Sequence, residues 1–135
     1  MINLLRRERY SVSALRVHLI CVTKYRRSVF TAESLAVIEK SFLEVAQKTD
    51  CKIEEFNGEA DHIHVLIEYP PKLSISQLVN YFKGVSSRRY GQAGFKKPYG
   101  KEALWSSSYF VSSVEGTPID IYATDSPHRS FSNLT

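Results

Sequence analysis

The stretch that most constrains the fold of this chain is the short alternating run Asp61–Ile67. Its residues are mostly β-branched or apolar, and Pro70-Pro71 closes it, which predicts a β-strand. Successive side chains of a strand point to opposite faces. The expected faces are Ile63, Val65 and Ile67 on one side and His62, His64 and Leu66 on the other. Imidazoles two residues apart stand about 7 Å apart at their backbones, close enough to bind one divalent ion. The alternative is two histidines on a half-solvated strand without a ligand.

The other regular stretches follow a recognisable order. Thr31 is a candidate helix cap, and Ser74-Ile75-Ser76-Gln77 matches a capping box. Asn57-Gly58 is a hairpin-turn signal directly before the histidine strand. The expected elements are a strand over Leu15–Val22, a helix from Thr31 to Asp50, a strand over Lys52–Asn57, the histidine strand, a helix from Ser74, and a last strand over Tyr109–Val114.

This order predicts an α+β domain of the ferredoxin-like, RRM-like βαββαβ type. In that arrangement one antiparallel sheet carries both helices on the same face. Ile63, Val65 and Ile67 would then face the helices, and His62 and His64 would lie on the open face.

Length and composition fit one globular domain spanning residues 1–135, with 43% apolar and 24% charged residues. We expect residues 1–13 to form a basic N-terminal arm and residues 123–135, rich in Ser, Thr, Asp and Asn, to form an irregular tail. No apolar run reaches the roughly 18 residues of a membrane span, and no signal peptide is evident. We therefore expect a cytoplasmic protein with no membrane partner. Cys21 and Cys51 are expected to be free thiols.

Positive charge is concentrated in two regions of the chain. Residues 69–101 contain no Asp or Glu, and the first 30 residues contain Glu8 as their only acid. A polarised basic surface indicates a polyanionic partner, most often nucleic acid, and the alternative is an ordinary solvated basic face. The candidate nucleic-acid-binding residues are Lys24, Tyr25, Arg26, Arg27, Lys83, Arg88 and Arg89. Tyrosines among these charges, such as Tyr25, suit stacking on unpaired bases.

The sequence resembles the IS200/IS605-type transposases, single-tyrosine members of the HUH nuclease group. Their signature is His-hydrophobic-His on a central strand, which His62-Ile63-His64 fits. The other motifs that carry the resemblance are Val22–Arg27, Leu78–Gly84, Leu104–Ser106 and Ser108–Val111.

The resemblance implies a homodimeric enzyme that cuts and rejoins single-stranded DNA at the ends of a mobile element and recognises hairpins near those ends. It implies that His62 and His64, with a glutamine, hold Mg²⁺ or Mn²⁺, and that a tyrosine on a C-terminal helix forms a 5′-phosphotyrosine link. A phenol is a weak nucleophile near neutral pH, so an ion that offsets phosphate charge is needed. No P-loop motif is present, and no nucleotide cofactor is expected.

The C-terminal region departs from the family pattern. The helix opening is matched by Gly116–Ile121, but the expected tyrosine falls at Asp125 and the expected glutamine at Arg129. Pro127 would interrupt a helix there. Tyr122 is then the candidate nucleophile, and the alternative is an ordinary tail tyrosine.

Two functions therefore remain open. The chain is either a transposase, or a catalytically inactive remnant that binds single-stranded or hairpin nucleic acid. Around the histidines, His18 is expected to be a satisfied buried residue rather than a support of the site, and Asp61 a turn residue rather than a ligand. Trp105 is expected to be a packing anchor.

Overall fold

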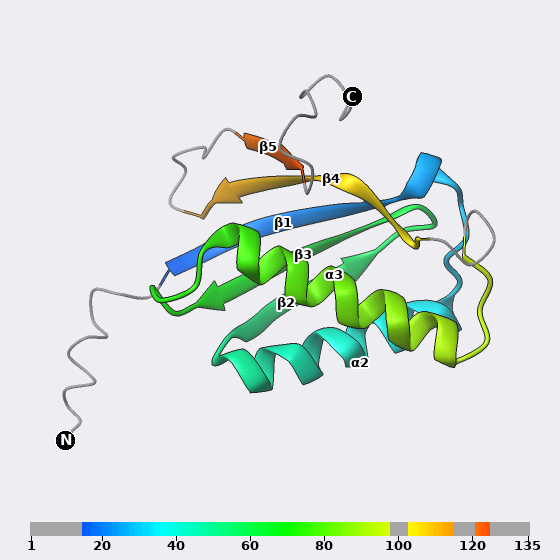
Figure 1. The fold of residues 1–135 in the computed structure, drawn as a ribbon, viewed down its shortest axis with the longest axis horizontal. Helices are drawn as coiled ribbons and strands as arrows, with labels where there is room; N and C mark the ends of the chain where they lie inside the picture. The colour runs from blue at the N-terminus through cyan, green and yellow to red at the C-terminus, as the bar shows by residue number, and fades with distance from the viewer. Residues whose placement is uncertain (1–14, 98–102, 115–120, 125–135) are drawn as a thin grey trace.

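The computed structural model describes residues 15–97, 103–114 and 121–124. Five antiparallel strands form one sheet in the order β2-β3-β1-β4-β5, and both long helices cover the same face (Figure 1). The elements are β1 (Leu15–Thr23), the 3₁₀ turn η1 (Lys24–Arg26), α2 (Ala32–Thr49), β2 (Lys52–Gly58), β3 (His62–Tyr69), α3 (Ile75–Gln92), β4 (Trp105–Ser113) and β5 (Ile121–Thr124). The predicted βαββαβ fold is confirmed, and β5 adds a strand at the edge of the sheet.

Both helices begin where the capping signals predict. Ser34 N donates to Thr31 Oγ1 at 3.2 Å, and Thr31 N donates to Ser34 Oγ at 2.8 Å. At α3, Ser74 and Gln77 make the same reciprocal pair. These bonds satisfy backbone N–H groups that have no partner within the helix.

The core lies between the helices and one face of the sheet. Ile63, Val65 and Ile67 are fully buried, as the alternation in β3 predicts. Phe42 of α2 stacks on Phe82 of α3 with ring centroids 4.6 Å apart. Trp105 is confirmed as a packing anchor: it is buried, and its Nε1 donates to Ser86 Oγ at 2.9 Å.

The hairpin before β3 turns later than Asn57-Gly58 indicates. Gly58 still belongs to β2 and β3 begins at His62, so the loop consists of Glu59, Ala60 and Asp61, and Glu59 N donates to His62 O at 2.8 Å. A larger residue at Gly58 would displace the Leu35 side chain, because an added Cβ would lie 2.5 Å from Leu35 Cδ2.

The C-terminal strands also differ from the predictions. β4 begins at Trp105, four residues before the expected Tyr109, because its backbone pairs with β1 from Thr23 onward. Residues 121–124 form β5 instead of continuing the helix opening expected at Gly116–Ile121. Ile, Tyr and Thr favour strands, and the exposed edge of β4 offers a partner. Ala123 and Thr124, which were expected in the irregular tail, end this strand. The rest of that tail (residues 125–135), the expected basic arm (residues 1–13) and residues 116–120 of the helix opening lie outside the described residues.

Two expectations from composition can be compared with the structure. Cys21 is buried and Cys51 half-buried, and both are free thiols as predicted. Within the described ranges, no helix has the length and apolar character needed to cross a membrane.

Candidate nucleic-acid and metal site

The two histidines of β3 lie on the face of the sheet that the helices leave uncovered. The burial pattern alternates from half-buried His62 through buried Ile63 to half-buried His64. The prediction that both imidazoles project away from the core is confirmed. Burial first, and then the neighbouring His18, lowers the pKa of His64 below its ordinary value, so its ring is uncharged near neutral pH. An uncharged imidazole is the form that binds a metal ion.

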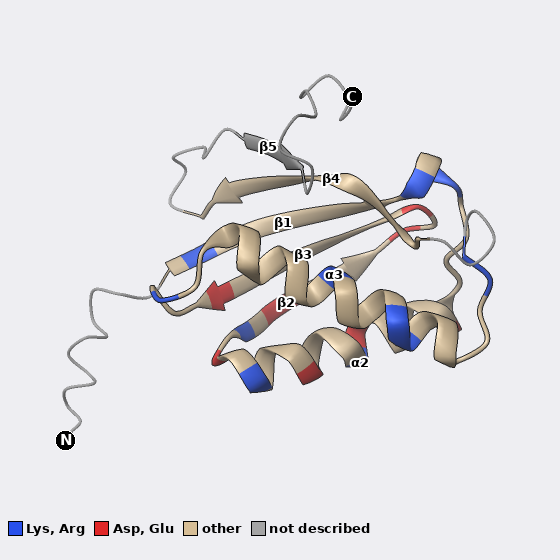
Figure 2. Ribbon diagram, viewed as in Figure 1, with Lys and Arg blue, Asp and Glu red and all other residues tan. Residues whose placement is uncertain are grey.

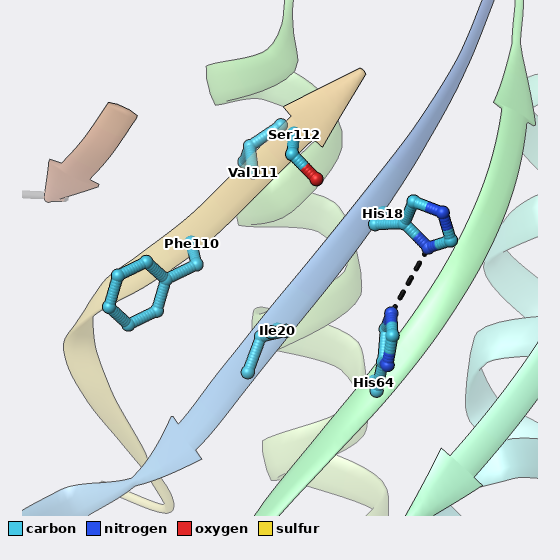
Figure 3. A pocket seen from close by; sticks show the side chains of 6 residues that line it. All are labelled: His18, Ile20, His64, Phe110, Val111 and Ser112. Atoms are coloured by element: carbon cyan, nitrogen blue, oxygen red, sulfur yellow. Dashed lines mark hydrogen bonds between the residues drawn. The ribbon is translucent and has the colours of Figure 1, made fainter. Parts of the chain in front are cut away.

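His18 of β1 contacts His64 directly. The His18 Nδ1 and His64 Nε2 atoms are 3.1 Å apart, and the ring centroids are 5.1 Å apart (Figure 3). The expectation of a buried structural histidine is therefore wrong: His18 is half-buried on the open face. The pattern of β1 indicated that His18 lies on the open face, because Arg16, His18 and Ile20 alternate with the core residues Val17 and Leu19.

A shallow pocket of about 350 Å³ opens beside these two imidazoles. Figure 3 shows its lining side chains on three strands, β3, β1 and β4. The lining residues are His18, Ile20, His64, Phe110, Val111 and Ser112. The site thus combines nitrogen donors with an apolar floor on an exposed sheet face.

The other histidine of the pair, His62, is held by the preceding residue. Its Nδ1 donates to Asp61 Oδ1 at 2.9 Å, and Asp61 Oδ2 lies 3.6 Å from Arg26 Nε. The hydrogen bond from His62, together with the charge of Arg26, holds the pKa of Asp61 below its usual range. Asp61 lies in the hairpin loop, as expected for a turn residue, and it also fixes which nitrogen of His62 keeps its lone pair.

The basic turn after β1 lies at the same end of the sheet as His62. Val22, the last residue but one of β1, pairs with His62 in the register. Tyr25 and Arg26 have positive φ angles of 58° and 53°, and Thr23 Oγ1 holds the turn by donating to Arg27 O at 2.7 Å. Tyr25 is 63% exposed. Four predicted nucleic-acid-binding residues, Lys24, Tyr25, Arg26 and Arg27, are therefore brought next to the histidine strand.

The three predicted basic residues of α3 belong to the helix layer, and Figure 2 shows blue Lys and Arg segments along α3. Lys83 is buried, and its Nζ donates to Ser106 O at 2.7 Å and lies 5.6 Å from the centroid of the Tyr109 ring. Arg89 donates to both carboxylate oxygens of Glu44, at 2.6 and 3.1 Å. Arg88 is exposed. Lys83 and Arg89 thus have structural partners, and we leave them out of the proposed interface.

Tyr122 lies in the same register row as the histidine site. His64 pairs with Ile20, Ile20 with Phe110, and Phe110 with Tyr122. Three strand spacings of about 4.8 Å place the Tyr122 backbone about 14 Å from that of His64. Asp125 and Arg129, where the family pattern has its tyrosine and glutamine, lie outside the described residues.

His62 and His64 provide part of the donor set that a divalent ion needs. Within residues 15–97, 103–114 and 121–124, no three His, Cys, Asp or Glu side chains are already arranged around one ion. His62 and His64 nevertheless supply imidazole nitrogens on one face, and they leave coordination positions open for water or phosphate. The residues present therefore fit a divalent ion that is coordinated partly by the protein and partly by water or phosphate.

The fold and the site define a class: a ferredoxin-like domain with paired histidines on the uncovered face of its sheet. Residues 11–124 match the family described as "Transposase IS200 like". The chain belongs to this family of IS200-like transposases.

Two curated relatives agree with this assignment. The chain is 33% identical over 103 residues to the transposases for insertion sequence element IS200 of Salmonella typhimurium and Salmonella typhi. The matched region covers 73% of this chain and 66% of each relative, so the chain spans just under two thirds of their length.

Solved structures show the same fold. A Deinococcus radiodurans protein assigned as a transposase superimposes with a TM-score of 0.67 at 30% identity, covering 73% of this chain and 77% of that one. A REP-associated tyrosine transposase bound to a REP hairpin gives a TM-score of 0.57 at 13% identity, covering 78% of this chain and 59% of that one. At that identity, the second likeness concerns the fold alone.

Proposed function

We propose that this chain cuts and rejoins single-stranded DNA at the ends of a mobile element, through a metal-assisted 5′-phosphotyrosine intermediate and with recognition of a DNA hairpin. The observation that carries the proposal is the position of His62 and His64 on the uncovered sheet face, beside an exposed basic turn. Membership of the IS200-like transposase family supports the same substrate class. We further propose a cytoplasmic homodimer, as the family resemblance implies.

The metal-binding residues in this proposal are His62 and His64, with Mg²⁺ or Mn²⁺ as the ion. When bound, such an ion offsets charge on the scissile phosphate and favours the phenolate of the attacking tyrosine. Asp61 contributes by fixing the orientation of His62 through its 2.9 Å hydrogen bond. The apolar side chains of Ile20 and Phe110 form the floor on which the DNA strand lies.

The nucleic-acid contacts in this proposal are made by the turn after β1. Lys24, Arg26 and Arg27 neutralise phosphates, and exposed Tyr25 stacks on an unpaired base. Lys24 Nζ lies 5.6 Å from the centroid of the Tyr25 ring, so charge and aromatic surface are presented together. Arg88 extends the basic surface on α3.

Tyr122 is the proposed nucleophile. Its support is the register row that joins it to Phe110 and His64. The covalent link to the 5′-phosphate forms as the phosphodiester breaks and the 3′-hydroxyl leaves, so rejoining needs no nucleotide cofactor.

A second function is favoured by the C-terminal region. Residues 121–124 form a strand, and the positions of the family's tyrosine and glutamine are occupied by Asp125 and Arg129. On this alternative, the chain binds single-stranded or hairpin DNA without cutting it.

One assay separates the two functions. Hairpin-ended single strands are incubated with the protein and Mn²⁺, and covalent adducts are resolved on a denaturing gel. The proposed function predicts an adduct that Tyr122→Phe and the double variant His62→Ala/His64→Ala both abolish. Absence of an adduct from the unaltered chain, combined with a retained mobility shift on a native gel, would establish the binding-only alternative. An adduct formed by Asp125→Tyr/Arg129→Gln but not by the unaltered chain would exclude Tyr122 as nucleophile.

A further inference from the structure

The pocket on the open face of the sheet has an apolar centre and a polar rim. Ile20 of β1 pairs with His64 on one side and with Phe110 on the other, so it lies between them, as Figure 3 shows. His18 and Ser112 pair with each other two residues further along these strands and also line the pocket. The Ser112 hydroxyl is turned toward β1 (Figure 3). The pocket therefore combines an aromatic side chain and an apolar floor with hydrogen-bonding groups at its edge.

The charges around the pocket do not suit a phosphate inside it. Its lining among the described residues contains neither Lys nor Arg. Arg16, two residues before His18 on the same face, donates to Glu54 Oε1 at 2.7 and 3.0 Å, so a carboxylate already offsets its charge. The exposed cations lie in the basic turn Lys24–Arg27, beyond the other end of β1. Phosphates are therefore favoured at the turn, and the pocket is left for an uncharged group.

A nucleobase is an uncharged group with the required chemistry. Its flat faces stack on aromatic side chains, and its edges carry hydrogen-bond donors and acceptors. Phe110 supplies the aromatic ring, and the Ser112 hydroxyl can donate to or accept from a base edge. The volume of about 350 Å³ falls in the range of small-ligand sites, and the shallow, open form gives a base on a continuous strand access from the side.

The pocket also adjoins the proposed cleavage site. His64, an ion ligand in the proposed function, is part of its lining. On the far side, Phe110 pairs with Tyr122 of β5, the proposed nucleophile. The backbones of His64 and Phe110 are two strand spacings apart, about 9.6 Å. A group in the pocket thus lies between the ion site and the strand that carries Tyr122, beside the path of the scissile phosphate.

We propose that this pocket binds one unpaired base of the DNA strand, adjacent to the scissile phosphate, and that the base stacks on Phe110. This inference rests on the proposed function, because it takes single-stranded DNA as the substrate. It adds a base-binding subsite and the residue that holds the base. A base fixed there restricts the strand to the positions that place its phosphate over His62 and His64.

The test measures DNA binding in EDTA, so that no cleavage occurs. Two fluorescent probes carry the same DNA hairpin and a single-stranded extension of about ten nucleotides, within the range of single-strand binding sites. The extension is oligothymidylate in one probe and abasic in the other, so the phosphates are equal and only the bases differ. Fluorescence anisotropy measures the affinity of the full chain for each probe.

Three variants are compared with the unaltered chain. Phe110→Leu removes the ring but keeps apolar bulk, and Phe110→Tyr keeps the ring. Tyr81→Leu is the matched control, because Tyr81 is an aromatic residue of α3 that is 47% exposed in the helix layer on the other face of the sheet (Figure 1). Circular dichroism confirms that each variant is folded.

We expect Phe110→Leu to bind the thymidine probe at least about fivefold more weakly, the effect of losing one base–aromatic stack, and to bind the abasic probe unchanged. Phe110→Tyr and Tyr81→Leu should match the unaltered chain on both probes. Equal weakening of both probes by Phe110→Leu would mean that Phe110 supports the fold or the backbone contacts, and it would overturn the inference. Unchanged binding of both probes would also overturn it, while leaving DNA binding intact. If the unaltered chain binds neither probe, the proposed function itself fails.

Discussion

The imidazole Nδ1 of His62 lies 2.9 Å from Oδ1 of Asp61, the residue immediately before it. Asp61 also receives a backbone hydrogen bond from Thr23 N at 2.9 Å, so the hairpin loop is tied to the end of β1. Arg26 Nε lies 3.6 Å from the other carboxylate oxygen, so Asp61 links the basic turn (Lys24–Arg27) to His62 of the histidine strand. A carboxylate that accepts from one ring nitrogen leaves the other free for an ion and makes it more basic.

Replacing the Asp61 carboxylate should therefore weaken ion binding. We expect Asp61→Asn to lower Mn²⁺ affinity by about 10- to 100-fold, because the amide carries no charge to support the His62 ring. Calorimetric titration with Mn²⁺ measures the change. Glu59→Gln is the control, since it removes a charge from the same hairpin without touching this bond. Equal affinities in Asp61→Asn and the unaltered chain would mean that the contact is only a feature of the turn.

The sequence was sufficient to predict what depends on local pattern. Alternation in β3 placed His62 and His64 on the open face, and the capping residues Thr31 and Ser74 located both helix starts. The contact between His18 and His64 could not be predicted in this way. It depends on the register between β1 and β3, which long-range packing sets and alternation leaves open.

The burial of Lys83 also differs from what the sequence predicts. The sequence predicts Lys83 as a nucleic-acid contact together with Arg88 and Arg89, yet Lys83 is buried. Its neighbours at helical spacing, Val79, Ser86 and Tyr90, are also buried. The helical spacing of α3 therefore indicated that Lys83 lies on the buried face of the helix. Charge alone favoured the surface, but a long side chain can pass its ammonium across a helix–sheet interface to an acceptor such as Ser106 O.

Two glycines provide matched tests of the packing. At Gly58, an added methyl would lie 2.5 Å from Leu35 Cδ2 and 3.2 Å from Leu35 Cγ, so α2 or the Leu35 side chain must move. We expect Gly58→Ala to lower the free energy of unfolding by about 1 kcal/mol or more. At Gly84, within α3, nothing lies within 4 Å of the added methyl, and Gly84→Ala should stabilise by about 0.5 to 1 kcal/mol. Urea denaturation measures both values, and a neutral Gly58→Ala would show that the Leu35 side chain moves aside without cost.

The bridge between the two helices should make stability depend on pH in acid. The hydrogen bonds from Arg89 hold the pKa of Glu44 below its ordinary value of 4.5. The unfolded chain therefore takes up the proton first as the pH falls. The stabilisation is fully present above pH 4.5 and is lost as the pH falls toward the lower folded-state pKa.

Thermal unfolding from pH 7 to pH 3 tests this expectation. Glu44→Gln should lower the melting temperature at pH 7, and its difference from the unaltered chain should shrink below pH 4.5. Glu39→Gln, an exposed position on the same helix, provides the control. A difference for Glu44→Gln that stayed constant across this range would show that the pair does not titrate as proposed.

The last prediction concerns which cations contact DNA. Arg27 is exposed beside the histidine strand, whereas Lys40 is exposed on α2 in the opposite layer, so equal charge changes at the two positions should differ in effect. Each phosphate contact adds about one unit to the slope of log affinity against log salt. We expect Arg27→Ala to reduce that slope by about one for a hairpin-ended single strand, and Lys40→Ala to leave it unchanged. Fluorescence anisotropy between low and moderate salt measures both slopes. Equal reductions in the two variants would indicate diffuse attraction to the whole chain, because only a localised interface makes the position of a positive charge matter.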